Sequence, residues 1–374
     1  MKFSCDYKVH YPLGGASYVF EKDLIKYISN KIRKNNIIIS IGAQPNSSPH
    51  FGTLCVFSLA FSLAKKMKEY NENINIFVLF EVVDTAPSKT IEINGIKYQY
   101  DLKGTEKMEN SMKDFLSVLK YLSKKTKIDY QIRNQSEFNS QPEIYKAVSS
   151  VIKNKNKIQG MLDPKNEHLR IRIACPKCGL VDKEGLTTKI MKKEILAKCP
   201  SHGQYKAIYK SESSKLEYNT PLRNLIRGMV YGMINSSSSY DYEIIRITGG
   251  DYSGFYQEEL LYKCASSCKY DVSKLPIILY CPQILDWSGA KLSKSIYVQN
   301  GAYNDLPKYM LNYKELHSIF KNKCLDILQE ETDNWLDEPY KLFRNYSVYY
   351  FIQKFEKEIE KDDRFKKSSE RNNW

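Results

Sequence analysis

The sequence predicts an α/β fold in which a doubly wound parallel sheet is covered by helices on both faces. Two observations carry this prediction. Runs of β-branched and other apolar residues at 37–41 and 73–83 are typical of strands buried on both faces. Helical patterns follow these runs, and alternating strands and helices build parallel sheets. A chain of 374 residues with 42% apolar residues can form a normal core, as two or three domains or as one domain with insertions.

Local patterns define the remaining elements. Asn94-Gly95 predicts a hairpin spanning 91–100, because both residues accept the positive φ that a two-residue hairpin turn needs. Polar residues at 236–240 are expected to form a loop. Strands are also predicted at 128–132 and 243–248. Helices are predicted at 21–33, 54–68, 107–124, 142–153, from 221 onward, and at 253–263, 316–330 and 339–361.

The chain divides into four predicted regions. Residues 1–169 would form the first half of the sheet domain, and residues 211–304 its second half. An insert at 170–210 separates the halves, and a short helical region at 305–374 follows them. The sheet is therefore expected to assemble from two stretches that are separated in the sequence.

The charge balance favours a polyanionic partner. Lys and Arg number 57 against 43 Asp and Glu, which gives a formal net charge of +14. RNA and nucleotide substrates are such partners, although lysines that only solvate the surface give the same surplus. No stretch reaches the roughly 20 apolar residues of a membrane span, and the first residues lack a signal-peptide core. We therefore expect a cytoplasmic protein with no membrane partner. The odd count of nine cysteines also argues against a secreted disulfide framework.

The first candidate site follows the strand at 37–41. The chain breaks at Gly42, crosses a polar loop and reaches Pro49-His-Phe-Gly-Thr53 at the start of a helix. A strand, a turn and a helix N-terminus together form an anion-binding corner. His50 would donate a hydrogen bond to the anion, and Gly52 would leave space for a flat ring or a phosphate. Taken alone, a histidine in this position more often only caps the helix.

Two further motifs lie in the second half of the sheet domain. The polar loop Gly289-Ala-Lys-Leu-Ser-Lys-Ser295 offers two cations, Lys291 and Lys294, and two hydroxyl groups. The strand at 243–248 ends in Gly249-Gly250-Asp251, where glycines permit close approach and a carboxylate can accept two hydroxyl hydrogen bonds. The Gly-Gly-Asp motif is consistent with a ribose-binding site. The alternative is a local turn without a ligand, because turns often contain Gly-Asp.

The insert carries a metal-ligand pattern. Cys175 and Cys178 form one pair with a two-residue gap, and Cys199 and His202 form another after a further 20 residues. Two tight turns that each offer two ligands suit a tetrahedral ion, and three thiolates with one imidazole suit zinc. Four protein ligands close the coordination shell, so we expect structural Zn²⁺. The alternative is a set of free thiols near one histidine.

Taken together, the Pro-His-Phe-Gly and Lys-Leu-Ser-Lys-Ser segments resemble the two signature motifs of class I aminoacyl-tRNA synthetases. Thr53 replaces the second histidine of many members. The metal insert, Ser214-Lys-Leu-Glu-Tyr218 and Gly249-Gly-Asp-Tyr252 follow in the order of class I lysyl-tRNA synthetases. The resemblance covers roughly residues 20–310 and leaves no room for that family's full anticodon-binding domain. It implies a Rossmann-type catalytic domain. The sequence departs from the family at 83–89 and 218–223, which help to shape the amino-acid pocket, so the amino acid stays open.

This resemblance implies ATP-dependent amino-acid activation, with Mg²⁺ accompanying ATP. The amino acid would become an aminoacyl-adenylate and pass to tRNA, as in a truncated lysine–tRNA ligase, or to a small-molecule amine or other carrier. A non-catalytic RNA-binding paralogue is the third possibility. The implied catalytic residues are His50, Lys291 and Lys294. The implied ATP-binding residues are Gly42, Pro49, Gly52, Thr53, Gly249, Gly250, Asp251, Ser293 and Ser295, and the amino-acid-binding candidates are Asp84, Tyr252, Tyr256 and Gln257.

Overall fold

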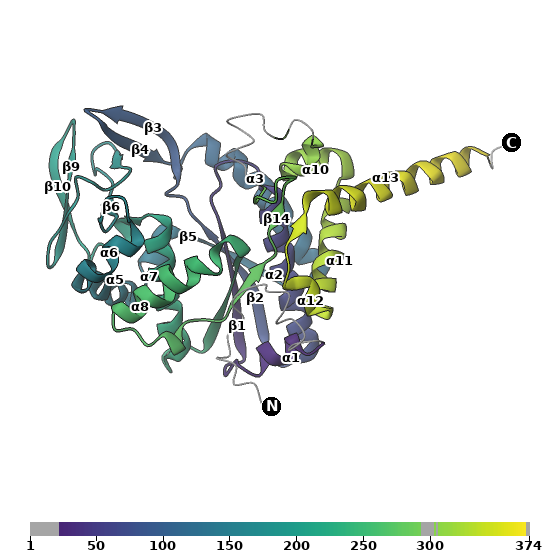
Figure 1. Cartoon of the computed structure of the whole chain (residues 1–374), viewed down its shortest axis with the longest axis horizontal. Helices are drawn as coiled ribbons and strands as arrows, with labels where there is room; N and C mark the ends of the chain where they lie inside the picture. Colours follow the sequence, from purple (N-terminus) through teal and green to yellow (C-terminus); the bar gives the residue numbers. More distant parts are fainter. Residues whose placement is uncertain (1–21, 293–302, 304–305, 372–374) are drawn as a thin grey trace.

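A five-stranded parallel sheet forms the centre of the molecule in the computed structural model, which describes residues 22–292, 303 and 306–371. Its strand order is β13-β12-β1-β2-β5, and every neighbouring pair is parallel. The chain starts at the central strand, builds outward to one edge and then returns to build the other edge (Figure 1). This is the Rossmann-type topology. The predicted doubly wound parallel sheet is therefore confirmed. The strands are β1 (Asn36–Ala43), β2 (Asn75–Val82), β5 (Tyr130–Asn134), β12 (Tyr242–Gly249) and β13 (Ile278–Cys281).

Successive side chains along a strand pack alternately into two separate hydrophobic cores, one on each face of the sheet. In β1, Ile37, Ile39 and Ile41 belong to one buried cluster, whereas Ile38 belongs to the other. The alternation follows from the two-residue period of a strand. It also explains the near-continuous apolar run in the sequence, because both faces of the sheet are covered.

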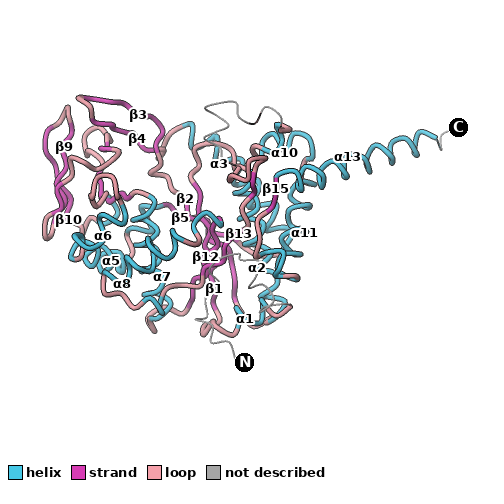
Figure 2. Tube along the Cα trace, in the orientation of Figure 1, coloured by secondary structure: helices cyan, strands magenta, loops and turns pink. Residues whose placement is uncertain are grey.

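Helices cover both faces, as the tube in Figure 2 shows. The first face carries α2 and α3 together with the C-terminal helices, and the second carries α5 to α8. We call these the α2 face and the α7 face. The α2 face holds α1 (Leu24–Ser29), α2 (Phe51–Tyr70), α3 (Glu106–Thr126), α10 (Tyr313–Phe320), α11 (Lys323–Asp337), α12 (Pro339–Leu342) and α13 (Val348–Arg371). The α7 face holds α5 (Pro142–Lys153), α6 (Lys155–Leu162), α7 (Thr220–Ser236) and α8 (Cys264–Ser267).

The C-terminal helices extend the core of the sheet domain. The ring of Phe51 in α2 lies edge-on to Phe351 in α13, with centroids 5.0 Å apart. Ser62 in α2 and Thr332 in α11 share a buried hydrogen bond of 2.8 Å. Beyond these contacts, α13 projects away from the body of the molecule (Figure 1).

Short strands form the insert and its neighbours. The hairpin predicted at Asn94-Gly95 is present, with φ of 52° and 76° at the two turn residues. Gly179 and Gly203, which follow the two Cys/His pairs, also have positive φ, at 73° and 74°. These strands are β3 (Pro87–Ile93), β4 (Ile96–Asp101), β6 (Ile171–Ile173), β7 (Val181–Asp182), β8 (Lys189–Ile190), β9 (Glu194–Cys199), β10 (Gly203–Ile208) and β11 (Leu216–Tyr218).

Several predicted helices have different limits or are broken. The helix predicted at 316–330 is two helices, because Lys321 has a φ of 49° that ends α10. The helix predicted at 339–361 is interrupted by β15 (Tyr346–Ser347), which pairs with β14 (Ile284–Leu285). The helix predicted at 253–263 is a π-helical segment, η4 (Tyr256–Lys263). The helix predicted at 21–33 shrinks to the six residues of α1. The remaining short segments are α4 (Gln135–Asn139), η2 (Ser213–Lys215), η3 (Gly250–Tyr252), η5 (Val272–Lys274) and η6 (Lys308–Met310).

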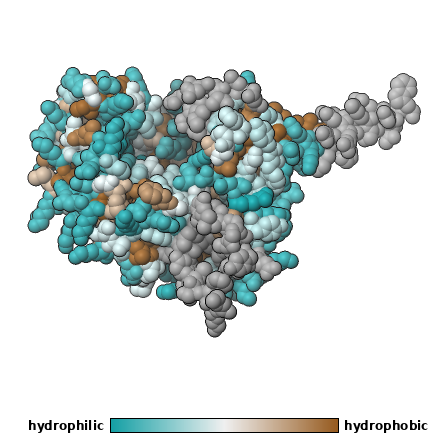
Figure 3. All heavy atoms as spheres, in the orientation of Figure 1, coloured by the Kyte–Doolittle hydropathy of each residue, from teal (hydrophilic) through white to brown (hydrophobic). Residues whose placement is uncertain are grey.

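The surface is mainly polar on the face drawn in Figure 3, where apolar residues occur in small scattered groups. Among the described helices, none combines the length and the apolar character that crossing a bilayer requires.

Candidate active site

A cavity of about 550 Å³ opens at the carboxyl ends of β1 and β12. Its walls come from the loop between β1 and α2, the first turn of α2, one side of α7, the end of β12, and the segment from Pro282 to Leu292. The two strands are adjacent, yet the chain leaves them in opposite directions across the sheet. Ligands of open α/β sheets bind at such a switch point.

His50 is the N-cap of α2. Its Nδ1 accepts a hydrogen bond of 3.3 Å from the backbone N–H of Thr53, which leaves Nε2–H as the donor of the ring. A β-carbon on Gly52 would lie 3.3 Å from Cε1 of His50, so glycine here gives the imidazole its space. The carbonyl of Pro49 accepts from the N–H of Tyr313, which ties this corner to α10. Gly42, Pro49, His50, Gly52 and Thr53 all line the cavity.

Asp251 and Lys291 reach the same cavity from two other segments. The Nζ of Lys291 lies 2.5 Å from Oδ2 of Asp251. A β-carbon on Gly249 would lie 2.4 Å from Oδ1 of Asp251, and one on Gly250 would lie 3.0 Å from the carbonyl oxygen of Cys281. Gly249 therefore leaves space for the carboxylate of Asp251, and Gly250 permits close approach to the backbone at Cys281. Ser293, Lys294 and Ser295 lie outside the described residues.

The four predicted amino-acid-binding residues are placed differently from one another. Tyr252 lines the cavity. The ring of Tyr256 packs edge-on against the ring of Tyr252, with centroids 5.0 Å apart. Asp84 and Gln257 are buried and do not line the cavity. Oδ1 of Asp84 has no hydrogen-bond partner among the described residues, and Nε2 of Gln257 donates to the hydroxyl of Tyr262.

Three arginines of the cavity wall are not among the predicted site residues, although Arg223 ends the stretch 218–223 that the sequence resemblance associates with the amino-acid pocket. Arg223 and Arg227 lie one turn apart on α7, and Arg246 lies on β12. The signal was present in the sequence, because both α7 arginines interrupt an apolar helical pattern and Arg246 interrupts the run Ile-Ile-Arg-Ile. A charged residue within an otherwise buried element needs a partner or a function.

Two buried glutamates, Glu81 and Glu217, interact electrostatically with arginines of the cavity wall. Glu81 forms an ion pair with Arg133 and accepts a hydrogen bond of 2.5 Å from Tyr231. Burial raises the pKa of Glu81, but the charges of Arg227 and Arg133 outweigh it, so the pKa lies below its ordinary value. The Glu81 carboxylate is therefore ionised at neutral pH.

For Glu217, the effect of burial on the pKa outweighs the effect of the nearby arginines. Its Oε2 accepts a hydrogen bond of 3.0 Å from Arg172. Burial nevertheless raises the pKa of Glu217 to about 7, although Arg172 and Arg223 act against it. This carboxyl group titrates near neutral pH beside the arginine-lined wall.

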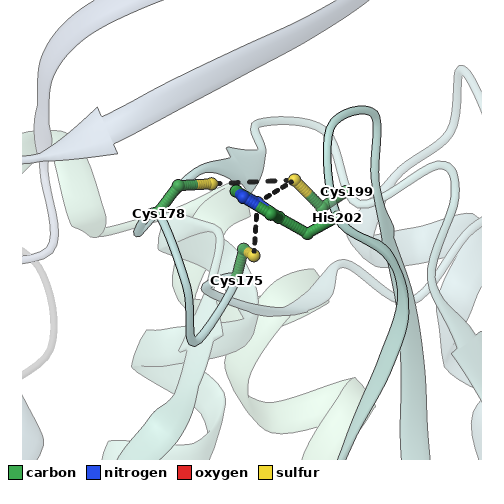
Figure 4. Close-up of side chains that lie close together, drawn as sticks. All are labelled: Cys175, Cys178, Cys199 and His202. Carbon is green, nitrogen blue, oxygen red and sulfur yellow. Dashed lines mark hydrogen bonds between the residues drawn. The ribbon is translucent and has the colours of Figure 1, made fainter.

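The four predicted metal ligands meet at one point in the insert, as Figure 4 shows. Cys178 Sγ lies 3.6 Å from Cys199 Sγ, and His202 Nδ1 lies 3.6 Å from Cys175 Sγ and 3.5 Å from Cys199 Sγ. Tetrahedral zinc with ordinary bond lengths separates its thiolate and imidazole ligand atoms by about 3.6–3.8 Å. The donor set and its spacing therefore fit a zinc ion.

No protein-family model matches this sequence, and no curated protein does so. Solved structures of aminoacyl-tRNA synthetases resemble the fold. Glutamate-tRNA synthetase from Elizabethkingia anophelis is 10% identical with a TM-score of 0.41, over 84% of this chain and 68% of that chain. Mycobacterium tuberculosis methionyl-tRNA synthetase in complex with methionyl-adenylate is 10% identical with a TM-score of 0.41, over 86% and 68%. At this identity the likeness concerns the fold alone, and TM-scores below 0.5 are too low to support a shared function.

Proposed function

We propose that this chain activates an amino acid with ATP, forming an aminoacyl-adenylate and releasing pyrophosphate. One observation carries the proposal: His50, Asp251 and Lys291, which are remote in the sequence, line a single cavity at the switch point of the sheet. Each has a chemistry that suits a different part of ATP. The sequence motifs that contain them support the same reading.

The triphosphate would lie at the N-terminus of α2. Backbone N–H groups and the helix dipole favour an anion there, and Nε2–H of His50 adds a donor. Lys291 and Lys294 would neutralise charge that develops on the leaving pyrophosphate. The carboxylate of Asp251 would accept hydrogen bonds from the ribose hydroxyls, with Gly249 and Gly250 allowing the sugar to approach. Mg²⁺ would accompany ATP and screen its phosphates.

The bond changes balance without an acid or base from the protein. A carboxylate oxygen of the amino acid bonds to the α-phosphorus while the bond from that phosphorus to the bridging oxygen breaks. Pyrophosphate leaves with the electron pair. Because an amino-acid carboxylate is ionised at neutral pH, no general base is required. The task of the protein is then to orient the two reactants and stabilise charge.

The acceptor of the activated amino acid is either tRNA or a small-molecule amine. The net charge of +14 fits an RNA partner. The lysine specificity implied by the sequence resemblance is not supported by the structures named above, which are a glutamate and a methionyl enzyme.

We also propose that Cys175, Cys178, Cys199 and His202 hold a structural Zn²⁺. The four protein ligands complete a tetrahedral shell, so the ion would stabilise the insert and take no part in the reaction.

Amino-acid-dependent exchange of labelled pyrophosphate into ATP tests the proposed reaction. We expect exchange with at least one standard amino acid or close analogue, and a loss of about 100-fold in His50→Ala. His168→Ala is the matched control, because His168 contacts the carbonyl of Gly185 outside the cavity. The absence of exchange across the whole panel, with folded protein, would refute the proposal. Deacylated tRNA and a panel of amines then distinguish the acceptors.

A further inference from the structure

The cavity joins two compartments on opposite faces of the central sheet. In β12, Ile245 and Ile247 belong to the core of the α2 face, so the alternating residues Arg246 and Thr248 point to the α7 face. The helices α2 and α7 lie on opposite sides of the sheet (Figure 2). His50 caps α2, whereas Arg223 and Arg227 extend from α7. The corner at the N-terminus of α2 and the arginines therefore line one cavity from opposite faces of the sheet.

The arginine end has a surplus of positive charge. Asp251 is the only carboxylate among the described residues that line the cavity, and it is paired with Lys291. Among the described residues, no carboxylate oxygen lies within 4.0 Å of the guanidinium nitrogens of Arg223, Arg227 or Arg246. Three cationic groups thus share one wall without a direct anionic partner.

The hydrogen bonds of these arginines go to neutral groups. Arg223 donates to the carbonyl of Tyr218 at 2.7 Å. Arg227 donates to the side chain of Gln135 at 2.7 Å, and Arg246 donates to that of Asn224 at 2.8 Å. The Nε atoms of Arg223 and Arg227 are buried without a hydrogen-bond partner among the described residues. Two guanidinium N–H groups within this wall therefore have no acceptor among the described residues.

The two nearby buried glutamates are already engaged. Glu81 pairs with Arg133, and Glu217 pairs with Arg172. Their charges act on Arg227 and Arg223 through space, but neither forms an ion pair with an arginine of the cavity wall. Burial and then the charge of Arg227 lower the pKa of Arg246, which is the sign of a cation that lacks an anion.

We infer, on the basis of the proposed function, that the amino acid activated here is acidic and that Arg223, Arg227 and Arg246 bind its side-chain carboxylate. A dicarboxylate such as aspartate or glutamate offers one carboxylate to the α-phosphate and a second to the arginine wall. Guanidinium groups bind carboxylates through paired, charge-assisted hydrogen bonds. The ammonium group of a lysine side chain would instead meet three like charges in a confined space.

The triphosphate of ATP is the other anion that could reach the arginines. Its own site accounts for it, because the N-terminus of α2, His50 and Lys291 supply the N–H groups and the cation that would bind the triphosphate. A second anion is needed at the α7 end for the charges to balance there.

Two measurements on the wild-type chain test the inference. The first is pyrophosphate exchange with aspartate, glutamate, neutral amino acids and lysine, and the second is calorimetric binding of the same amino acids without ATP. Exchange and binding confined to acidic amino acids are expected. Exchange with lysine or neutral amino acids only would overturn the inference and leave the proposed function intact. Binding of acidic amino acids without exchange by any amino acid would overturn the proposed activation and leave only the binding of a dicarboxylate by the arginines. Failure of both measurements would overturn both proposals.

Variants of the arginine wall give a second test. Arg246→Gln is expected to raise the KM for the acidic amino acid by about 10- to 100-fold with a smaller change in kcat, and Arg246→Lys to recover part of that loss. Arg33→Gln, which changes an exposed arginine before β1, is the matched control and should leave KM unchanged. Equal KM values for Arg246→Gln, Arg246→Lys and wild type would contradict binding by Arg246.

Discussion

The ammonium group of Lys291 lies 2.5 Å from the carboxylate of Asp251, within the cavity that both residues line. In the proposed reaction Lys291 binds the phosphates and Asp251 binds the ribose of ATP. Without ATP, the two side chains form an ion pair with each other instead. Their side chains are 43% and 31% exposed. Pairs this accessible to solvent contribute about 0–1 kcal/mol, so ATP can replace this contact at little cost.

Asp251→Asn is expected to weaken ATP binding more than it weakens the fold. Charge-assisted hydrogen bonds to the ribose hydroxyls would be lost, which raises the KM for ATP by about 10-fold or more. The melting temperature should change little, because the pair with Lys291 is weak. Glu259→Gln breaks a comparable pair with Lys263 outside the cavity and serves as the control. An unchanged KM for ATP in Asp251→Asn would show that the carboxylate does not bind the nucleotide.

Lys294→Ala is expected to slow adenylate formation by a factor on the order of 100 or more, if the ammonium group supplies a few kcal/mol in the transition state. The prediction rests on the sequence motif, since Lys294 lies outside the described residues. Single-turnover kinetics with saturating ATP provide the measurement. Lys274→Ala, in an exposed pair with Asp271, is the control. A variant that forms adenylate at the wild-type rate would remove Lys294 from the mechanism.

The stability of the fold is expected to fall between about pH 4.5 and 7 because of Glu217. Its pKa in the folded chain is about 7, above the ordinary 4.5, since burial penalises the charged form. A raised pKa means that the folded state binds the proton more tightly. The stabilisation is therefore complete below pH 4.5 and is lost as the pH rises through 7.

Glu217→Gln should remove this part of the pH dependence, because glutamine does not titrate. The change is at most on the order of 3 kcal/mol, from a shift of about two and a half pKa units. Denaturant unfolding at several pH values from 4.5 to 7.5 measures it. Parallel pH profiles for wild type and variant would mean that Glu217 does not titrate in this range.

Cys178→Ser is expected to lower zinc content and stability while part of the chemistry remains. The ion would lose one of four ligands, and its binding energy contributes to folding of the insert. Metal analysis, thermal unfolding and pyrophosphate exchange on the same preparation give the comparison. The control is Cys268→Ser, which replaces a buried cysteine outside the cluster, and this variant protein should retain its full zinc content. A wild-type protein that is metal-free and fully stable would contradict the zinc assignment.

The fold was largely predictable because its signals are local. The apolar run at 37–41 belongs to β1, and helix α5 has the predicted limits of 142–153. The break at Lys321 was missed because a left-handed φ at a lysine leaves no mark in the hydrophobic pattern. The interruption of the last predicted helix was missed because β15 is fixed by pairing with β14, which is remote in the sequence.

The candidate site was predictable only where its residues form short motifs. His50, Asp251 and Lys291 each lie within a recognisable stretch, and all three reach one cavity. Arg227 and Arg246 belong to separate elements, and their juxtaposition depends on how α7 packs on the sheet. The spacing of Arg227 and Arg246 in the sequence does not indicate that they line the same cavity. The acidic preference inferred for the substrate could therefore come only from the structure.

Direct detection of the adenylate tests the central claim most directly. Wild-type protein is mixed with ATP, Mg²⁺ and each amino acid in turn, with pyrophosphatase present, and the bound products are identified by mass spectrometry. We predict an aminoacyl-adenylate whose formation requires the amino acid and is strongest with aspartate or glutamate. Protein that binds ATP yet forms no adenylate with any amino acid would contradict the account.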